Sequence, residues 1–156
     1  MNRKAAATSL NSSHAGTCPP EPSAVKSQRR VLVRNLRSQS VIASEVEVAA
    51  THLRRLVGLL GRTRKWATPG NALWIRPSKG IHTFGMLFPI DVIFLDGELR
   101  VVYLQENVRP FRISAIRREA LNVLELPALT INGTGTRVGD QLEIVAWNES
   151  GMRTEK

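Results

Sequence analysis

The segment FPIDVIFL, from Phe88 to Leu95, is apolar apart from one acidic residue, Asp91, and is followed by the pair Asp96-Gly97. An Asp-Gly pair between apolar segments is a strong signal for a β-hairpin, because both residues tolerate the left-handed conformations of a tight turn. The segment therefore predicts a buried strand and an antiparallel partner after the turn. Asp91 needs a fixed partner inside such a strand, because burying a carboxylate without one is costly.

A two-residue turn would also fix the register of this hairpin. Leu95 then faces Glu98, and Asp91 and Arg100 become diagonal neighbours on one face, within reach of each other's side chains. The other face of the hairpin is apolar, and it is formed by Ile90, Val92, Phe94, Leu99, Val101 and Tyr103.

Other short apolar segments, separated by turn-rich stretches, run through the rest of the chain. Their alternating or β-branched composition predicts strands. We expect strands at VLVRNL (31–36), VIASEVEVA (41–49), ALWIRP (72–77), LNVLELP (121–127) and QLEIVAW (141–147). About six to eight short strands predict a mainly β domain, a small antiparallel barrel-like or jelly-roll-like fold with one clear helix, and not a parallel sheet.

The segment THLRRLVGLLGR, residues 51–62, is the one with helical periodicity. Thr51 is suited to the N-cap, and Gly61 to the left-handed residue that follows a helix. The spacing of the apolar residues predicts a stripe along one face of this helix, formed by Leu53, Leu56, Val57 and Leu60.

The length of 156 residues favours one folded domain. Residues 1–28, with few large apolar side chains, are predicted to be a disordered basic tail, residues 29–148 a single mainly β domain, and residues 149–156 a flexible C-terminus. The net charge is +9, and residues 1–30 contribute +4 of it, because they contain five basic residues and one acidic residue. Much of the basic character therefore lies in the tail.

Targeting and cofactor signals are few. No apolar core of a signal peptide follows Arg3 and Lys4, and no segment is long enough to span a bilayer, so we expect a cytoplasmic protein without membrane contact. Cys18 is the only cysteine, which excludes a disulfide within the chain. The three histidines lack metal-ligand spacing and no glycine-rich phosphate-binding fingerprint is present, so we expect no metal and no cofactor.

The polar residues of the central segment suggest a binding site. We predict a polar cleft lined by His82, Asp91, Arg100 and Arg109, which would bind a small anionic ligand or a protein partner. A structural alternative is that Asp91 accepts hydrogen bonds from main-chain amides of the loop His82–Gly85. A third possibility is an enzyme with His82 and Asp91 as an acid–base pair, but no nucleophile accompanies them.

Two further residues, Arg112 and Glu125, could converge with Asp91 in the same pocket. Arginine side chains are suited to carboxylate and phosphate groups. Separate surface ion pairs are the plainer expectation for such residues.

A basic run provides the alternative function. Arg54, Arg55, Arg62, Arg64 and Lys65 occur without an intervening acid and are followed by Trp66. Such a run could hold phosphates and stack a base, which would give sequence-independent nucleic-acid binding together with the basic tail. The structural interpretation is a solvated helix face and loop, with Trp66 folded onto the core.

Several motifs occur together in an order that resembles a known family. They are GLLGR (Gly58–Arg62), IHTFGMLFPIDVIFLD (Ile81–Asp96), VLELPA (Val123–Ala128) and GTRVGD (Gly135–Asp140). This part of the chain, roughly Val31 to Val145, is similar to domain-of-unknown-function family one-nine-two (DUF192). The resemblance implies a compact, mainly β domain with one packed helix, and it implies no known activity. Where related sequences usually have glycine after Leu-Pro-Ala, this chain has Leu129, so the turn there is expected to be strained or differently shaped if that glycine is left-handed.

Overall fold

The apolar segment is a strand, β4 (Ile90–Leu95), and all six of its residues are buried. The computed structural model describes residues 30–51, 58–147 and 153–154. Its other strands are β1 (Arg30–Asn35), β2 (Val41–Ala49), β3 (Gly70–Ile75), β5 (Val101–Val108), β6 (Asn122–Pro127), β7 (Leu142–Trp147) and β8 (Arg153–Thr154). Two short helices accompany them, the 3₁₀ helix η1 (Arg64–Trp66) and the α-helix α2 (Thr130–Thr134).

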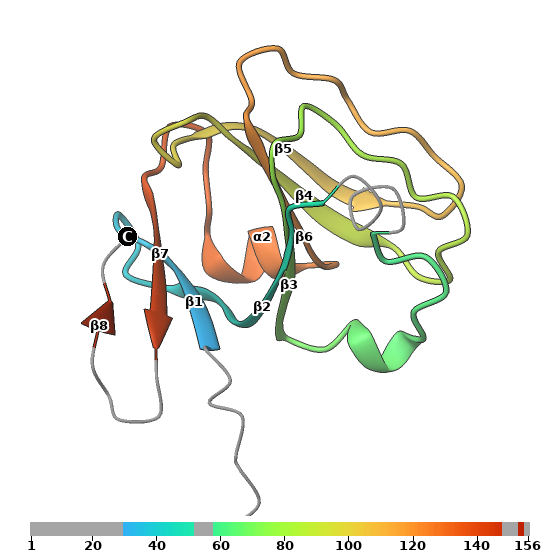
Figure 1. Cartoon of the computed structure of the whole chain (residues 1–156), viewed down its shortest axis with the longest axis horizontal. Helices are drawn as coiled ribbons and strands as arrows, with labels where there is room; N and C mark the ends of the chain where they lie inside the picture. The colour runs from blue at the N-terminus through green and yellow to red at the C-terminus, as the bar shows by residue number, and fades with distance from the viewer. Residues whose placement is uncertain (1–29, 52–57, 148–152, 155–156) are drawn as a thin grey trace, which may run out of the picture.

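The strands form one curled sheet in the order β5-β4-β6-β3-β2-β1-β7-β8 (Figure 1). Neighbouring strands are antiparallel, with β2 and β3 the one parallel pair among the described strands. The start of β5 reaches the start of β7, because Val101 N–H donates to Asp140 O and Gly139 N–H to Val101 O, both at 2.8 Å. The sheet is therefore a half-barrel, which confirms the mainly β, barrel-like expectation.

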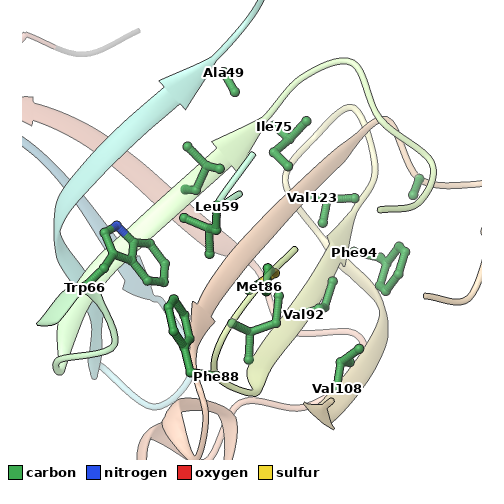
Figure 2. Close-up of a cluster of buried hydrophobic side chains, with 13 residues drawn as sticks. Ala49, Leu59, Trp66, Ile75, Met86, Phe88, Val92, Phe94, Val108 and Val123 are labelled. Atoms are coloured by element: carbon green, nitrogen blue, oxygen red, sulfur yellow. The ribbon is translucent and has the colours of Figure 1, made fainter. Parts of the chain in front are cut away.

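The two faces of the half-barrel carry separate apolar clusters. The inner cluster joins residues of distant strands, among them Val33, Ile93 and Leu124, and Ile131 of α2 packs into it. The outer cluster lies on the other face of β3, β4 and β6, and loop residues cover it (Figure 2). Since side chains alternate along a strand, Val123 and Glu125 of β6 face outward while Leu124 and Leu126 face inward.

The hairpin exists, but the predicted register is wrong. Leu95 pairs with Val101 instead of Glu98, so the connection spans residues 96–100. A two-residue turn of type I′ needs positive φ at both residues, and in this connection Leu99 adopts it instead, at φ 65°. The Asp96 carboxylate stabilises the longer turn by accepting the N–H groups of Glu98 and Arg100, each at 2.9 Å. The residues of β4 therefore pair with residues of β5 that lie later in the chain than predicted.

The predicted helix is only partly open to comparison, because residues 52–57 lie outside the described residues. Its expected last turn is wrong, since Gly58 has φ 47° and residues 58–61 form turns. Gly61 does adopt the predicted left-handed conformation, at φ 71°. The predicted tail and most of the C-terminal segment also lie outside the described residues. No helix among the described residues is long and apolar enough to cross a membrane.

The turn before α2 contains Leu129, where the family resemblance leads us to expect a glycine. Leu129 has φ 71° and ψ 2°, a left-handed conformation that is unfavourable for a residue with a Cβ atom. Its side chain is largely exposed and contributes little packing. We expect Leu129→Gly to raise the free energy of unfolding by about 1 kcal/mol, measured by urea denaturation. Val138→Gly, at an exposed residue without positive φ, serves as the control and should not stabilise; a destabilised Leu129→Gly variant would contradict the strain.

A buried polar cluster closes the end of the half-barrel near β7. Asp140 accepts hydrogen bonds from the side chains of Arg37 and Asn35 and from the main chain of Arg137. The hydrogen bond from Arg37 is the main reason that the pKa of Asp140 is lowered to about 2. The GTRVGD segment thus has a structural role, fixing the β1–β2 turn against the start of β7.

Candidate functional site

Asp91 is completely buried on the inner face, and both of its carboxyl oxygens have main-chain donors. The N–H of Asn107 donates to Oδ1 at 3.0 Å, and the N–H of Ile131 donates to Oδ2 at 2.9 Å. The expectation of a fixed donor is confirmed, but the donors belong to β5 and α2 and not to the His82–Gly85 loop. Asp91 therefore ties the end of β5 and the start of α2 to the central strand β4.

Arg100 does not meet Asp91, so the predicted diagonal pair is wrong. Asp91 lies opposite Leu126 of β6. Arg100 precedes β5, forms a bridge with Gln141, and donates to Gly139 O at 3.3 Å. Arg109 follows β5, at the other end of this eight-residue strand. The structure thus separates Arg100 from Arg109 by a strand length, roughly 25 Å.

His82 and Arg109 lie on two loops that run side by side. His82 forms an antiparallel bridge with Ile113. Buried Thr83 links the loops most strongly, because its hydroxyl donates to Arg109 O at 2.8 Å and accepts the N–H of Arg112 at 2.9 Å. No local pattern in the sequence predicts this role of Thr83, since its partners lie more than twenty residues away.

These paired loops expose several large apolar side chains. We call the exposed surface of residues 80–88 and 109–117 the loop face. Phe111 is exposed although it adopts φ 59°, a costly conformation for an aromatic residue, and its N–H is held by Thr83 O at 2.9 Å. The His82 ring lies against Phe84, with centroids 5.5 Å apart. The exposed apolar residues of the loop face are Phe84, Leu87, Phe111, Ile113 and Ile116.

The loop face and the residues that flank it are also basic. Residues 76–90 and 107–118 contain no aspartate or glutamate. Arg76 and Arg117 are held over aromatic rings, 4.4 Å from the Trp74 centroid and 3.6 Å from the Tyr103 centroid. In the part of the chain that the structure describes, no ion pair is formed by the other basic residues of these segments, which are all exposed: Lys79, Arg109, Arg112 and Arg118.

The basic run around residue 60 is only partly described, and its aromatic residue is folded onto the core as the structural interpretation expects. Arg54 and Arg55 lie outside them. Arg62 is paired with Glu47 through two hydrogen bonds of 2.8 and 2.6 Å. Trp66 is buried and stacks on Phe88, so it is not available to stack a base. Arg64 and Lys65 remain exposed.

Glu125 is also a buried acid, and its surroundings differ from those of Asp91 and Asp140. It lies on the outer face of β6, between Leu73 of β3 and Val92 of β4. Its exposed fraction is 2%, and Oε2 has no hydrogen-bond partner. Burial raises the pKa of Glu125 to about 8, so the carboxyl group is protonated at neutral pH. It does not converge with Asp91, which faces the opposite side of the sheet.

The titratable residues do not suggest metal chemistry. Within the described ranges, no group of three His, Cys, Asp or Glu side chains is close enough to hold a metal ion. Among the described residues His82 and Asp91 are also not a hydrogen-bonded pair: the Asp91 oxygens accept from Asn107 and Ile131, and His82 Nδ1 is buried without a partner.

Comparison with known proteins gives the family and the fold. Residues 33–144 match the DUF192 family, described as "Uncharacterized ACR". A UPF0127 protein of Pyrococcus abyssi is 37% identical over 105 residues, covering 64% of this chain and 85% of that protein. A UPF0127 protein of Thermococcus sibiricus is 32% identical over 117 residues, covering 70% of this chain and 71% of that protein.

Two solved structures share the fold. A protein from Sinorhizobium meliloti, described as a candidate transcription regulator, superposes with a TM-score of 0.63 at 24% identity, covering 80% of this chain and 95% of that one. A protein of unknown function from Novosphingobium aromaticivorans gives a TM-score of 0.61 at 21% identity, covering 87% of this chain and 99% of that one. At these identities the likeness shows the fold alone.

Proposed function

The chain belongs to the uncharacterised DUF192 family, and we propose that it is a non-catalytic binding module whose contact surface is the loop face. The observation that supports this function best is the combination of exposed Phe111, Ile113 and Phe84 with unpaired arginines on loops fixed by Thr83. Aromatic residues and arginine are enriched where proteins bind each other. Of the predicted binding residues, His82 and Arg109 belong to this surface, while Asp91 and Arg100 lie outside it.

The chemistry of the loop face favours a protein partner over a small anion. A free anion would engage the arginines and leave the five exposed apolar side chains in water. A protein segment that carries both acidic and large apolar residues would cover both. We therefore propose an acidic, apolar segment of a partner protein, with carboxylates meeting Arg109 and Arg112 and apolar side chains meeting Phe111 and Ile113.

Synthetic peptides test this proposal directly. Fluorescence anisotropy would compare a peptide of mixed Asp, Glu, Leu and Phe with one whose acids are replaced by Lys and one whose apolar residues are replaced by Ser. We expect only the first to bind. The double variants Phe111→Ser/Ile113→Ser and Arg109→Glu/Arg112→Glu should each weaken its binding at least about tenfold, since truncating a central contact costs more than about 1 kcal/mol.

The control is Val138→Ser, which removes an equally exposed apolar side chain from the turn before β7 and should leave the affinity unchanged. The same assay with citrate, anionic phospholipid vesicles and single-stranded DNA separates the other partner classes. The proposal would be overturned if the protein bound any of these as tightly as the acidic–apolar peptide. It would also be overturned if both double variants bound that peptide with unchanged affinity.

A further inference from the structure

An apolar residue in place of Glu125 would stabilise the fold better than Glu125 does. The described protein offers its Oε2 atom no hydrogen bond, although the residue lies on β6, between two neighbouring strands. Its register neighbours are Leu73 and Val92, and the cluster on that face consists of apolar residues. A buried polar group without a partner normally costs stability and calls for an explanation.

The cover above this face is made of loops. Leu59, Trp66, Met86 and Phe88 pack onto the outer cluster, and they come from residues 58–69 and 80–89, outside the strands of the sheet (Figure 2). The two cover loops meet where Gly61 N–H donates to Gly85 O at 3.4 Å, a long hydrogen bond. At this point the two cover loops are therefore joined to each other only weakly.

A protonated carboxyl group offers a donor and an acceptor side by side. A ligand group matches this pair when it carries an acceptor next to a donor. A primary amide and a lactam each have such an edge. An ammonium ion fits less well, because a charge would enter an apolar layer of a strongly basic chain. The apolar walls around Glu125 suit a ligand whose remaining surface is hydrocarbon.

We propose that Glu125 anchors a small, largely apolar ligand through two parallel hydrogen bonds to an amide or lactam edge, beneath the loops 58–69 and 80–89. This site lies under loop 80–89, whose exposed surface belongs to the loop face, but the ligand does not depend on the proposed partner. Glutamine presents the same donor–acceptor edge as the protonated acid, whereas leucine presents none. Glu125→Gln should therefore keep the site, and Glu125→Leu should abolish it.

Benzamide, N,N-dimethylbenzamide and ethylbenzene are suitable probes, because they share an aromatic body and differ in the polar edge. Amide chemical shifts of the labelled full-length protein would be followed during titration below and above pH 8. Below pH 8, we expect benzamide to shift residues of β3, β4, β6 and the cover loops in the wild type and in Glu125→Gln. We expect no such shifts in Glu125→Leu, and at least tenfold weaker binding of the dimethyl compound.

Above pH 8 the wild type loses the donor and should bind benzamide at least tenfold more weakly, while Glu125→Gln should not change. Phe111→Ser/Ile113→Ser should bind benzamide like the wild type, which separates this site from the loop face. The proposal is overturned if benzamide shifts no resonance of the wild type, if Glu125→Leu binds it equally well, or if ethylbenzene binds as tightly as benzamide.

Discussion

Replacement of Asp91 by alanine should lower the free energy of unfolding by about 4 kcal/mol, because it leaves two buried N–H groups without an acceptor. The donors, Asn107 and Ile131, lie 16 and 40 residues away, so the variant loosens both β5 and α2 from β4. Urea denaturation followed by tryptophan fluorescence measures the change. The effect is large compared with the total stability of a typical domain, about 5–15 kcal/mol.

Two variants make this result specific. Asp91→Asn keeps one acceptor oxygen and should lose less stability than Asp91→Ala. Glu106→Ala removes an exposed acid from β5, and its free energy of unfolding should stay within about 0.5 kcal/mol of the wild type. If Asp91→Ala were no less stable than Glu106→Ala, the structural role of Asp91 would be wrong.

Glu125→Leu should have the opposite effect and stabilise the protein at neutral and alkaline pH. Glu125 keeps its proton in the folded state up to about pH 8, whereas its unperturbed pKa is 4.5. Between these values the unfolded chain binds fewer protons than the folded one, so stability falls as the pH rises, by about 1.4 kcal/mol per pH unit. Over this whole pH range the wild type loses at most about 5 kcal/mol of unfolding free energy. The Glu125→Leu variant does not undergo this loss, because leucine does not titrate.

Denaturation curves from pH 4 to about 9 test this pH dependence. The wild type should lose stability through the window relative to Glu125→Leu, and the difference should level off above pH 8. Glu125→Gln should also lack the slope, but it should be less stable than the leucine variant, because its amide is buried without a partner. Parallel pH profiles of the wild type and Glu125→Leu would show that Glu125 is not protonated in the fold.

The sequence predicted the parts of the fold that depend on local pattern. The segment LNVLELP was correctly predicted as a strand, and the apolar segment around Asp91 was correctly predicted as a buried strand. The missing glycine correctly marked Leu129 as a strained position. The hairpin register was wrong, because the Asp96 side chain stabilises a longer turn than the Asp-Gly pair suggests.

The site was harder to predict, because it depends on contacts between distant segments. Whether a strand face is solvated or covered depends on loops elsewhere in the chain, and this decides the state of Glu125. The sequence does not indicate that Phe111 and Ile113 are exposed, because their position depends on the pairing of their loop with the loop of His82 and Thr83. The donors of Asp91 are likewise distant in the chain, and no spacing rule points to Asn107 or Ile131.

The proposed binding role of the loop face can be tested most directly by mapping amide chemical shifts of the labelled protein while the acidic–apolar peptide is titrated. We expect the largest shifts in residues 80–88 and 109–117, with little change in β1, β2 and β7. Shifts concentrated on those three strands, or no shifts with any peptide of the panel, would contradict it.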